Sequence, residues 1–141
     1  LVGVDDLLDG WSGLADAGRT LEHDVLAPVR EGRPGRYRRY DWHAGRFAED
    51  VPVPPVDLVV VEGVGSWRTS YASWVTTLVW VEAPHDLRLA RGVARDGEAL
   101  RDHWAAWVAD EEALFRREGT RDRADLLVDG TGAGDRAVVI R

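Results

Sequence analysis

The chain has 141 residues, of which 45% are hydrophobic and 30% are charged, and its formal net charge at pH 7 is −7. This length and apolar content predict one globular domain over residues 1–141, with a hydrophobic core. The acidic balance excludes a nucleic-acid binder that relies on a basic surface. No apolar run approaches the ~20 residues of a membrane span, and the first residues lack a signal peptide's cationic region, so we expect a soluble, cytoplasmic protein without a membrane partner.

Cysteine, methionine and lysine are absent, so all 18 cationic residues are arginine. Without cysteine, disulfides and thiolate metal sites are excluded, and the four histidines are scattered without the spacing of metal ligands. Without lysine, the chain cannot contain a complete phosphate-binding loop of the GxxxxGK[ST] type. The missing methionine leads us to expect a piece of a longer protein or a start at a non-standard codon.

The first part of the chain predicts a strand, a helix and a long loop. Residues 1–4 read as the end of a buried strand, and residues 5–13 as a polar turn. Apolar residues at helical spacing predict a helix over residues 14–30, which Gly32 ends. Residues 31–55 contain four of the six prolines and five arginines. We expect this segment to be a loop on the substrate side.

The remainder of the chain predicts strands that alternate with helices. Residues 57–63 form a continuous β-branched run, which is typical of a strand covered on both faces. Further strands are expected at residues 76–81, 124–128 and 137–140, and helices at residues 84–95 and 98–118. This alternation predicts an α/β domain with a mostly parallel sheet.

Acids and glycines follow two of the predicted strands. Asp5 and Asp6 come after the first strand, and Glu62 and Gly63 end the second. Chemistry in open α/β sheets lies at the carboxyl ends of the strands. A carboxylate there can hold Mg²⁺ through water or accept a proton from a hydroxyl group, as phosphoryl transfer requires. The alternative for each acid is a turn cap, because aspartate and glycine dominate turns.

Arg88, Arg91 and Arg95 recur three and four residues apart, which places three guanidinium groups on one helical face. A guanidinium group is planar, permanently charged and able to bind two oxygens at once, so the stripe suits a phosphate tail. The alternative is a solvated helix face.

Five of the seven tryptophans fall into two groups. Trp104 and Trp107 share one face of the predicted helix 98–118, and we interpret them as core residues. The other residues of this face are Leu100, Glu111 and Leu114. Trp11, Trp42 and Trp67 lie in expected loops near the acids, where they either stack on a base or sugar or pack as lids.

Five segments resemble, in the same order, motifs of the uridine kinase-like branch of the P-loop nucleoside and small-molecule kinases. The segments are Asp5–Leu8, Tyr40–Arg46, Val59–Gly63, Asp86–Asp96 and Ala124–Val128. The fourth matches the lid-helix pattern Asp-x-Arg-Leu-x-Arg-x-Val-x-Arg-Asp closely. The segments extend over most of the chain.

The resemblance implies a P-loop NTPase-type, three-layer α/β/α fold that is truncated at its N-terminus. In this family a first strand, the phosphate loop with its lysine, and a helix precede the segment that resembles the start of this chain. The family's strand order, 2-3-1-4-5, places that first strand in the middle of the sheet. The strands near Asp57 and Thr76 would then flank a gap, and residues 84–118 would form lid-type helices.

The resemblance also implies an activity, which is transfer of a phosphoryl group from ATP, with Mg²⁺, to a hydroxyl of a nucleoside-like or other small acceptor. The catalytic residues would be Asp5 or its neighbour Asp6, together with Arg91 and Arg95. The nucleotide and Mg²⁺ would be held by Glu62 (through water), Gly63, Arg88 and Arg101. The acceptor would be held by Tyr40, Trp42, His43 and Arg46.

Two other function classes stay open at this point. A degenerate nucleotide-binding or regulatory domain would keep the fold without catalysis, and the missing lysine favours it. An interaction module that uses exposed tryptophans would leave the acids after the strands unexplained. The sequence does not define the acceptor or the oligomeric state, and we expect the chain by itself to be inactive.

Overall fold

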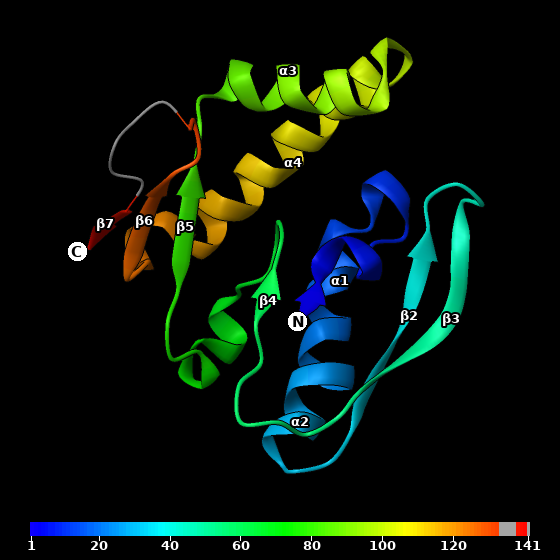
Figure 1. Ribbon diagram of the computed structural model, residues 1–141, viewed down its shortest axis with the longest axis vertical. Helices are drawn as coiled ribbons and strands as arrows, with labels where there is room; N and C mark the ends of the chain where they lie inside the picture. Colours follow the sequence, from blue (N-terminus) through cyan, green and yellow to red (C-terminus); the bar gives the residue numbers. More distant parts are fainter. Residues whose placement is uncertain (133–137, 141) are drawn as a thin grey trace. The chain divides into compact units, whose positions relative to one another are not determined.

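The computed structural model describes residues 1–132 and 138–140. Its contacts divide the chain into two compact units, Leu1–Arg68 and Thr69–Arg141. Helices occur together with short parallel and antiparallel sheets, so the structure is mixed α/β (Figure 1). Within the described residues, two strand pairs are parallel and two are antiparallel, so the expected mostly parallel sheet is not found. The single domain expected over residues 1–141 stays a prediction.

The first unit begins with a parallel strand pair. Strand β1 (Val2–Gly3) pairs with β4 (Val61–Glu62), and Gly3 lies opposite Glu62. Two short 3₁₀ helices, Val4–Leu7 and Gly10–Ser12, follow β1. The side chains that anchor this segment are buried, namely Val2, Val4, Leu7 and Leu8. Their burial fixes the position of the acids between them.

The helix predicted over residues 14–30 is confirmed. It consists of α1 (Leu14–Thr20), a π-helical stretch (Leu21–Leu26) and α2 (Ala27–Arg30). Pro28 accounts for the irregular middle, because its ring has no N–H and crowds the carbonyl four residues earlier. The apolar residues that predicted the helix pack inward, and Leu14, Leu21 and Val25 are buried.

The prediction of a loop over residues 31–55 is wrong, because this segment forms a β-hairpin. Strands β2 (Gly35–Asp41) and β3 (Arg46–Val53) pair antiparallel. The register shifts between Arg38 and Tyr40, which interrupts the in-out alternation that would have predicted a strand. The exposed arginines and the prolines around the end of β3 also made the sequence read as a loop.

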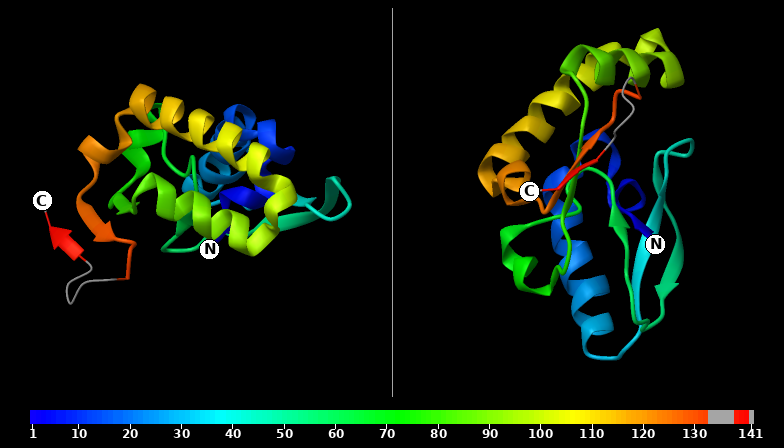
Figure 2. Two further views of the ribbon diagram at one scale, coloured as in Figure 1. Left: turned by 90° about the horizontal axis from the view of Figure 1, so that it is seen from above. Right: turned by 60° about the vertical axis from the view of Figure 1, so that its left-hand side comes forward.

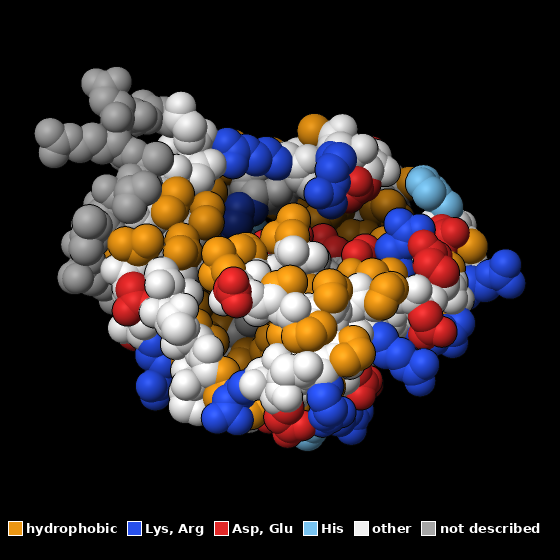
Figure 3. All heavy atoms as spheres, turned by 60° about the horizontal axis from the view of Figure 1, so that its bottom comes forward, with side chains coloured by type: hydrophobic (Ala, Val, Ile, Leu, Met, Phe, Trp, Pro, Cys, Tyr) orange, Lys and Arg blue, Asp and Glu red, His pale blue; other side chains and the backbone are white. Residues whose placement is uncertain are grey.

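The strand expected over residues 57–63 is shorter than predicted and is not covered on both faces. Only Val61–Glu62 pairs with β1, while Leu58 is 73% exposed and Val60 is 49% exposed. In the part of the chain that is described, β4 has no strand on its other edge. Hydrophobic side chains therefore reach the surface among charged ones (Figure 3).

The second unit holds a three-stranded sheet and its helices. Its elements are a 3₁₀ segment (Thr69–Trp74), β5 (Val79–Glu82), α3 (His85–Asp96), a 3₁₀ turn (Glu98–Leu100), α4 (Arg101–Glu118), α5 (Thr120–Arg123), β6 (Leu126–Asp129) and β7 (Val138–Ile140). The strand order is β5-β6-β7, with β5 and β6 parallel and β6 and β7 antiparallel. These elements match the predicted strands and helices to within a few residues. Ala137, the first residue of the last predicted strand, lies outside the described residues.

Helix α4 packs against the sheet of the second unit. The ring of Trp80 on β5 meets that of Phe115 edge-to-face at 4.5 Å between centroids. Helices α3 and α4 lie side by side (Figure 2). At their contact, a Cβ built at Gly92 would lie 2.7 Å from the ring of Trp104. Trp107, Glu111 and Leu114 of α4 are buried, as predicted for the core face, whereas Leu100 and Trp104 of the same face are half-buried. On β5, the two neighbours of Trp80, Val79 and Val81, are exposed.

Within the described ranges, no helix combines the length and apolar character needed to cross a membrane.

Candidate functional site

Two of the predicted acids lie together where β1 and β4 end. A Cβ built at Gly3 would lie 3.0 Å from Oε1 of Glu62, and one built at Gly63 would lie 3.8 Å from Oδ1 of Asp5. Glu62 thus covers the end of β1, while Asp5 approaches the backbone after β4. The structure therefore brings Asp5, Glu62 and Gly63 to one edge of the first unit.

The 3₁₀ turn Val4–Leu7 explains which side chains face outward. Val4 and Leu7 are buried, whereas Asp5 is exposed and Asp6 is partly exposed. The two carboxylates have different surroundings, because Asp6 accepts a hydrogen bond from the hydroxyl of Tyr37 at 3.3 Å. Asp5 is the more accessible of the two.

An aromatic cluster lies beside these acids. Its members are Trp11, Tyr40, Trp42 and Phe47. The ring of Trp42 meets that of Trp11 at 5.7 Å and that of Tyr40 at 5.2 Å, both edge-to-face, and Tyr40 meets Phe47 at 5.4 Å. The indole N–H of Trp42 donates to the carbonyl of Asp5 at 3.3 Å, which ties the hairpin to the acid-bearing turn. Trp42 remains 41% exposed, so an outside ligand can reach it.

Tyr37 is a site neighbour that the sequence reasoning missed. It is buried, and burial raises the pKa of its hydroxyl, with a further increase from the nearby charge of Asp6. What marks Tyr37 as a site neighbour is its inward position on β2. That position is defined only by the pairing of β2 with β3. Trp67, predicted either to stack on a ligand or to pack, is 5% exposed and is a packing residue.

His43 and Arg46 lie at the tip of the hairpin, and both are exposed. The carboxylate of Asp41 accepts the backbone N–H groups of His43 and Ala44, each at 2.9 Å. The hydrogen bond from Ala44 is the main cause that lowers the pKa of Asp41. Asp41 therefore organises the turn, and Gly45 completes it with a φ of +65°. The structure assigns His43 a turn position, while its predicted contact with the acceptor stays a prediction.

The predicted arginines lie in the second unit, and each has a partner there. Arg88 pairs with Glu111, whose side chain is only 8% exposed. Arg91 donates to the carbonyls of Gly130 at 2.7 Å and Thr131 at 2.8 Å. The interpretation of Arg88 as a solvated residue is therefore wrong, because it neutralises a buried carboxylate between α3 and α4.

Arg95 and Arg101 make local ion pairs. Arg95 donates to Asp96 at 2.8 and 3.0 Å and lies over the ring of Trp104 at 5.4 Å. The hydrogen bond from Arg95 is the main cause that lowers the pKa of Asp96. Arg101 pairs with Glu98. The charged groups of both pairs lie at the surface, where ion pairs contribute little to stability.

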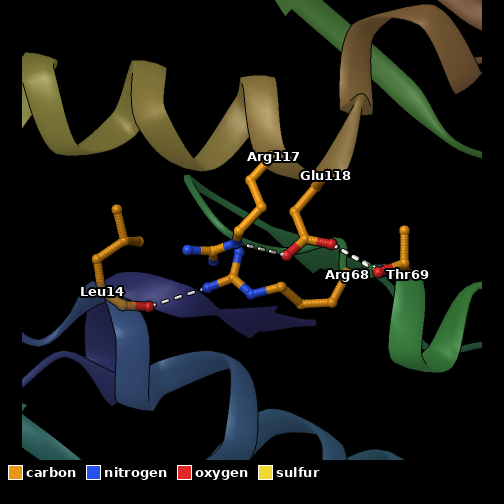
Figure 4. A network of polar contacts seen from close by, with 5 residues as sticks. All are labelled: Leu14, Arg68, Thr69, Arg117 and Glu118. Atoms are coloured by element: carbon orange, nitrogen blue, oxygen red, sulfur yellow. Dashed lines mark hydrogen bonds and ion pairs between the residues drawn. The ribbon is translucent and has the colours of Figure 1, made fainter.

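Arg68 is a second residue that sequence reasoning missed. It is 7% exposed, and its guanidinium group donates to the carbonyl of Leu14 at 2.9 Å (Figure 4). In the second unit, Glu118 is likewise buried and accepts the backbone N–H and the hydroxyl of Thr69 at 3.0 and 2.9 Å. Neither residue belongs to a recognisable motif, so only the folded contacts reveal them.

Among the residues that are described, no group of three or more histidines, aspartates and glutamates is arranged to hold a metal ion. The oxygen donors at the strand ends, Asp5 and Glu62, are of the type that Mg²⁺ prefers, and Mg²⁺ keeps several waters when few protein ligands are present. Binding of Mg²⁺ through water at Glu62 therefore stays a prediction.

Comparison of the chain with models of protein families and with curated proteins finds no match.

Proposed function

We propose that this chain is the acid-bearing and acceptor-binding part of an ATP-dependent kinase of the uridine kinase-like type. The acceptor is a nucleoside-like or other small hydroxyl compound. The observation that carries the proposal is the meeting of Asp5, Glu62 and Gly63 at adjacent ends of two parallel strands, beside the aromatic cluster. Three separate segments of the family resemblance supply this one site.

In the proposed mechanism, Asp5 orients the acceptor hydroxyl and accepts its proton. The exposed carboxylate suits this role better than that of Asp6, which is engaged by Tyr37. Trp42 and Tyr40 provide apolar ring surfaces that hold a flat base or sugar and shield the reacting hydroxyl from water. Catalysis of this kind depends on positioning and on electrostatic stabilisation.

Glu62 would hold Mg²⁺ through water. Arg91 would exchange its hydrogen bonds to backbone carbonyls, and Arg95 its ion pair with Asp96, for contacts with phosphate oxygens. ATP supplies the phosphoryl group when it is bound. Because the chain contains no lysine, a phosphate loop with its lysine has to come from another segment.

The strand pairing supports the P-loop type of fold. The family's order, 2-3-1-4-5, requires strand 2 beside strand 3 and strand 4 beside strand 5, both parallel. The parallel pairs β1–β4 and β5–β6 have this connectivity.

A second candidate is a nucleotide-binding domain without catalysis. It is favoured by the missing lysine and by the intramolecular partners of Arg88, Arg91, Arg95 and Arg101. Such a domain would bind nucleotide without turnover.

The test is phosphoryl transfer by the chain fused to a strand, a phosphate loop and a helix of this kinase family. We expect Asp5→Asn to reduce turnover on the order of 100-fold while ATP affinity is nearly unchanged, because the carboxylate acts on the acceptor. Asp6→Asn is the matched control. Loss confined to Asp6→Asn would reassign the base, and equal activity of both variants would refute the mechanism. ATP binding without any turnover would favour the second candidate.

A further inference from the structure

The loop that follows β4 begins directly after Glu62, the second acid of the candidate site. It contains two glycines with positive φ, Gly63 at +108° and Gly65 at +87°. Within the loop, the N–H of Ser66 donates to the carbonyl of Gly63 at 3.2 Å. Glycine adopts many backbone conformations, so such a loop needs an external anchor to hold one of them.

Arg68 provides that anchor. A Cβ built at Gly18 of α1 would lie 2.6 Å from Nε of Arg68. A Cβ built at Gly65 would lie 3.4 Å from both terminal guanidinium nitrogens of Arg68. The guanidinium group thus lies between the helix and the loop. At Gly18 it leaves no room for a side chain, whereas at Gly65 it is in ordinary contact and the nearest atom is Cδ1 of Leu14 at 3.0 Å. Its hydrogen bond to the carbonyl of Leu14 fixes it at the first residue of α1 (Figure 4).

The anchor closes a ring through the site. The segment from Gly3 to Leu14 carries Asp5, and the segment from Glu62 to Arg68 carries the second acid. The two segments are joined at one end by the pairing of Gly3 with Glu62, and at the other end by the bond from Arg68 to Leu14. A site held at both ends loses little conformational entropy when a ligand binds.

We propose that Arg68 is a positioning residue of the candidate site, which holds the loop after β4 so that Glu62 stays beside Asp5. The role rests on the proposed function, because it concerns the same two carboxylates. Arg68 itself is only 7% exposed, so the proposed role acts through the loop and not by direct contact with a ligand. The buried Trp67 next to it anchors the same end of the loop through packing.

The experiment measures amide hydrogen exchange and side-chain carboxyl ¹³C shifts by NMR in the full 141-residue chain. In Arg68→Gln we expect exchange at Ser66 to become about tenfold faster, with changed carboxyl shifts at Asp5 and Glu62, because the loop opens locally. Arg68→Lys should restore part of the protection, since an ammonium group can also donate to the carbonyl of Leu14. Arg36→Gln, on the exposed side of β2, is the control without effect.

A glycine pair keeps the proposal testable if Arg68→Gln does not fold. Gly65 and Gly32 both have positive φ, but only Gly65 has the guanidinium group within reach, while nothing lies near Gly32. Alanine costs backbone strain at both positions. We expect Gly65→Ala to accelerate exchange at Ser66 and Gly32→Ala to leave it unchanged.

Unchanged exchange and unchanged carboxyl shifts in Arg68→Gln and Gly65→Ala would overturn the proposal. So would equal acceleration throughout the first unit, which would indicate a purely structural role. These readouts need no nucleotide, so the two proposals fail separately. If the Arg68 variants change the loop as expected but the protein shows no transfer activity, only the kinase function is refuted. If phosphoryl transfer depends on Asp5 but the Arg68 variants leave the loop unchanged, only the positioning role of Arg68 is refuted.

Discussion

At the scale of single residues, the contact between Tyr37 and Asp6 separates two neighbouring aspartates by their surroundings. Tyr37 is buried and donates to Asp6, whereas Asp5 faces solvent. The burial and the adjacent negative charge raise the pKa of Tyr37 above its ordinary value of 10.0. The fold therefore favours the neutral phenol, which donates its hydrogen bond to Asp6.

This pair predicts a loss of stability in alkaline solution. Because the pKa is higher in the folded state, the contribution of Tyr37 is complete below about pH 10, the unfolded value, and is lost as pH rises through the folded value. Tyr37→Phe should remove this pH dependence and lower stability by about 1 kcal/mol through the lost hydrogen bond. Urea unfolding as a function of alkaline pH measures both effects. Tyr40→Phe removes a hydroxyl from the same strand as a control. An unchanged alkaline slope in Tyr37→Phe would contradict the prediction.

At the scale of elements, helix α3 shows that one arginine stripe performs several tasks. Its spacing predicted a common ligand, but the structure gives Arg88 a buried carboxylate, Arg91 two backbone carbonyls and Arg95 a neighbouring aspartate. Arg91 joins the helix to the turn after β6. Arg88 therefore has a structural role in the packing of α3 against α4. Phosphate binding stays a prediction for Arg91 and Arg95.

The two kinds of arginine should respond differently to alanine. Arg88→Ala leaves the carboxylate of Glu111 buried without its partner, so we expect a loss of about 1–3 kcal/mol of unfolding free energy. Arg95→Ala breaks an exposed pair and should change stability by less than about 0.5 kcal/mol. Chemical denaturation of both variants measures the difference. In the phosphate-loop fusion, alanine at 91 or 95 should weaken ATP binding. Equal stability of the Arg88 and Arg95 variants would contradict the assignment of Arg88.

At the scale of the whole molecule, exposed apolar side chains accompany unpaired strand edges. Val56, Leu58 and Val60 recur at every second residue before the end of β4, and Val79 and Val81 do so on β5. Within the described residues each of these strands has a partner on one side only. Edge strands with apolar side chains are destabilising and prone to association.

We therefore expect the chain by itself to be poorly stable and to bind ATP very weakly. Fusion to a strand, a phosphate loop and a helix of the proposed family should raise stability and ATP affinity together, because one unit would supply both the missing pairing and the phosphate contacts. Thermal melting of both proteins, with and without Mg-ATP, tests this. Cooperative melting of the short chain at high temperature, with strong stabilisation by ATP, would contradict the P-loop assignment.

The sequence by itself determined the elements whose signals are local. The helix over residues 14–30, helices α3 and α4, and the placement of acids after β1 and β4 all followed from periodicity within a few residues. Such patterns can be recognised in the sequence because a helix face or a strand end is defined by residues close together in the chain. Strand β4 was predicted too long because its length depends on a partner, and pairing is not local.

Only the tertiary structure decided which of these residues meet. The hairpin read as a loop because a register shift hides its alternation, and Tyr37 and Arg68 carried no motif at all. Tyr37 and Asp6 are 31 residues apart, and Arg68 and Leu14 are 54 residues apart. Contacts at such separation depend on how the whole chain closes its loops and buries its apolar faces, so no local pattern specifies them.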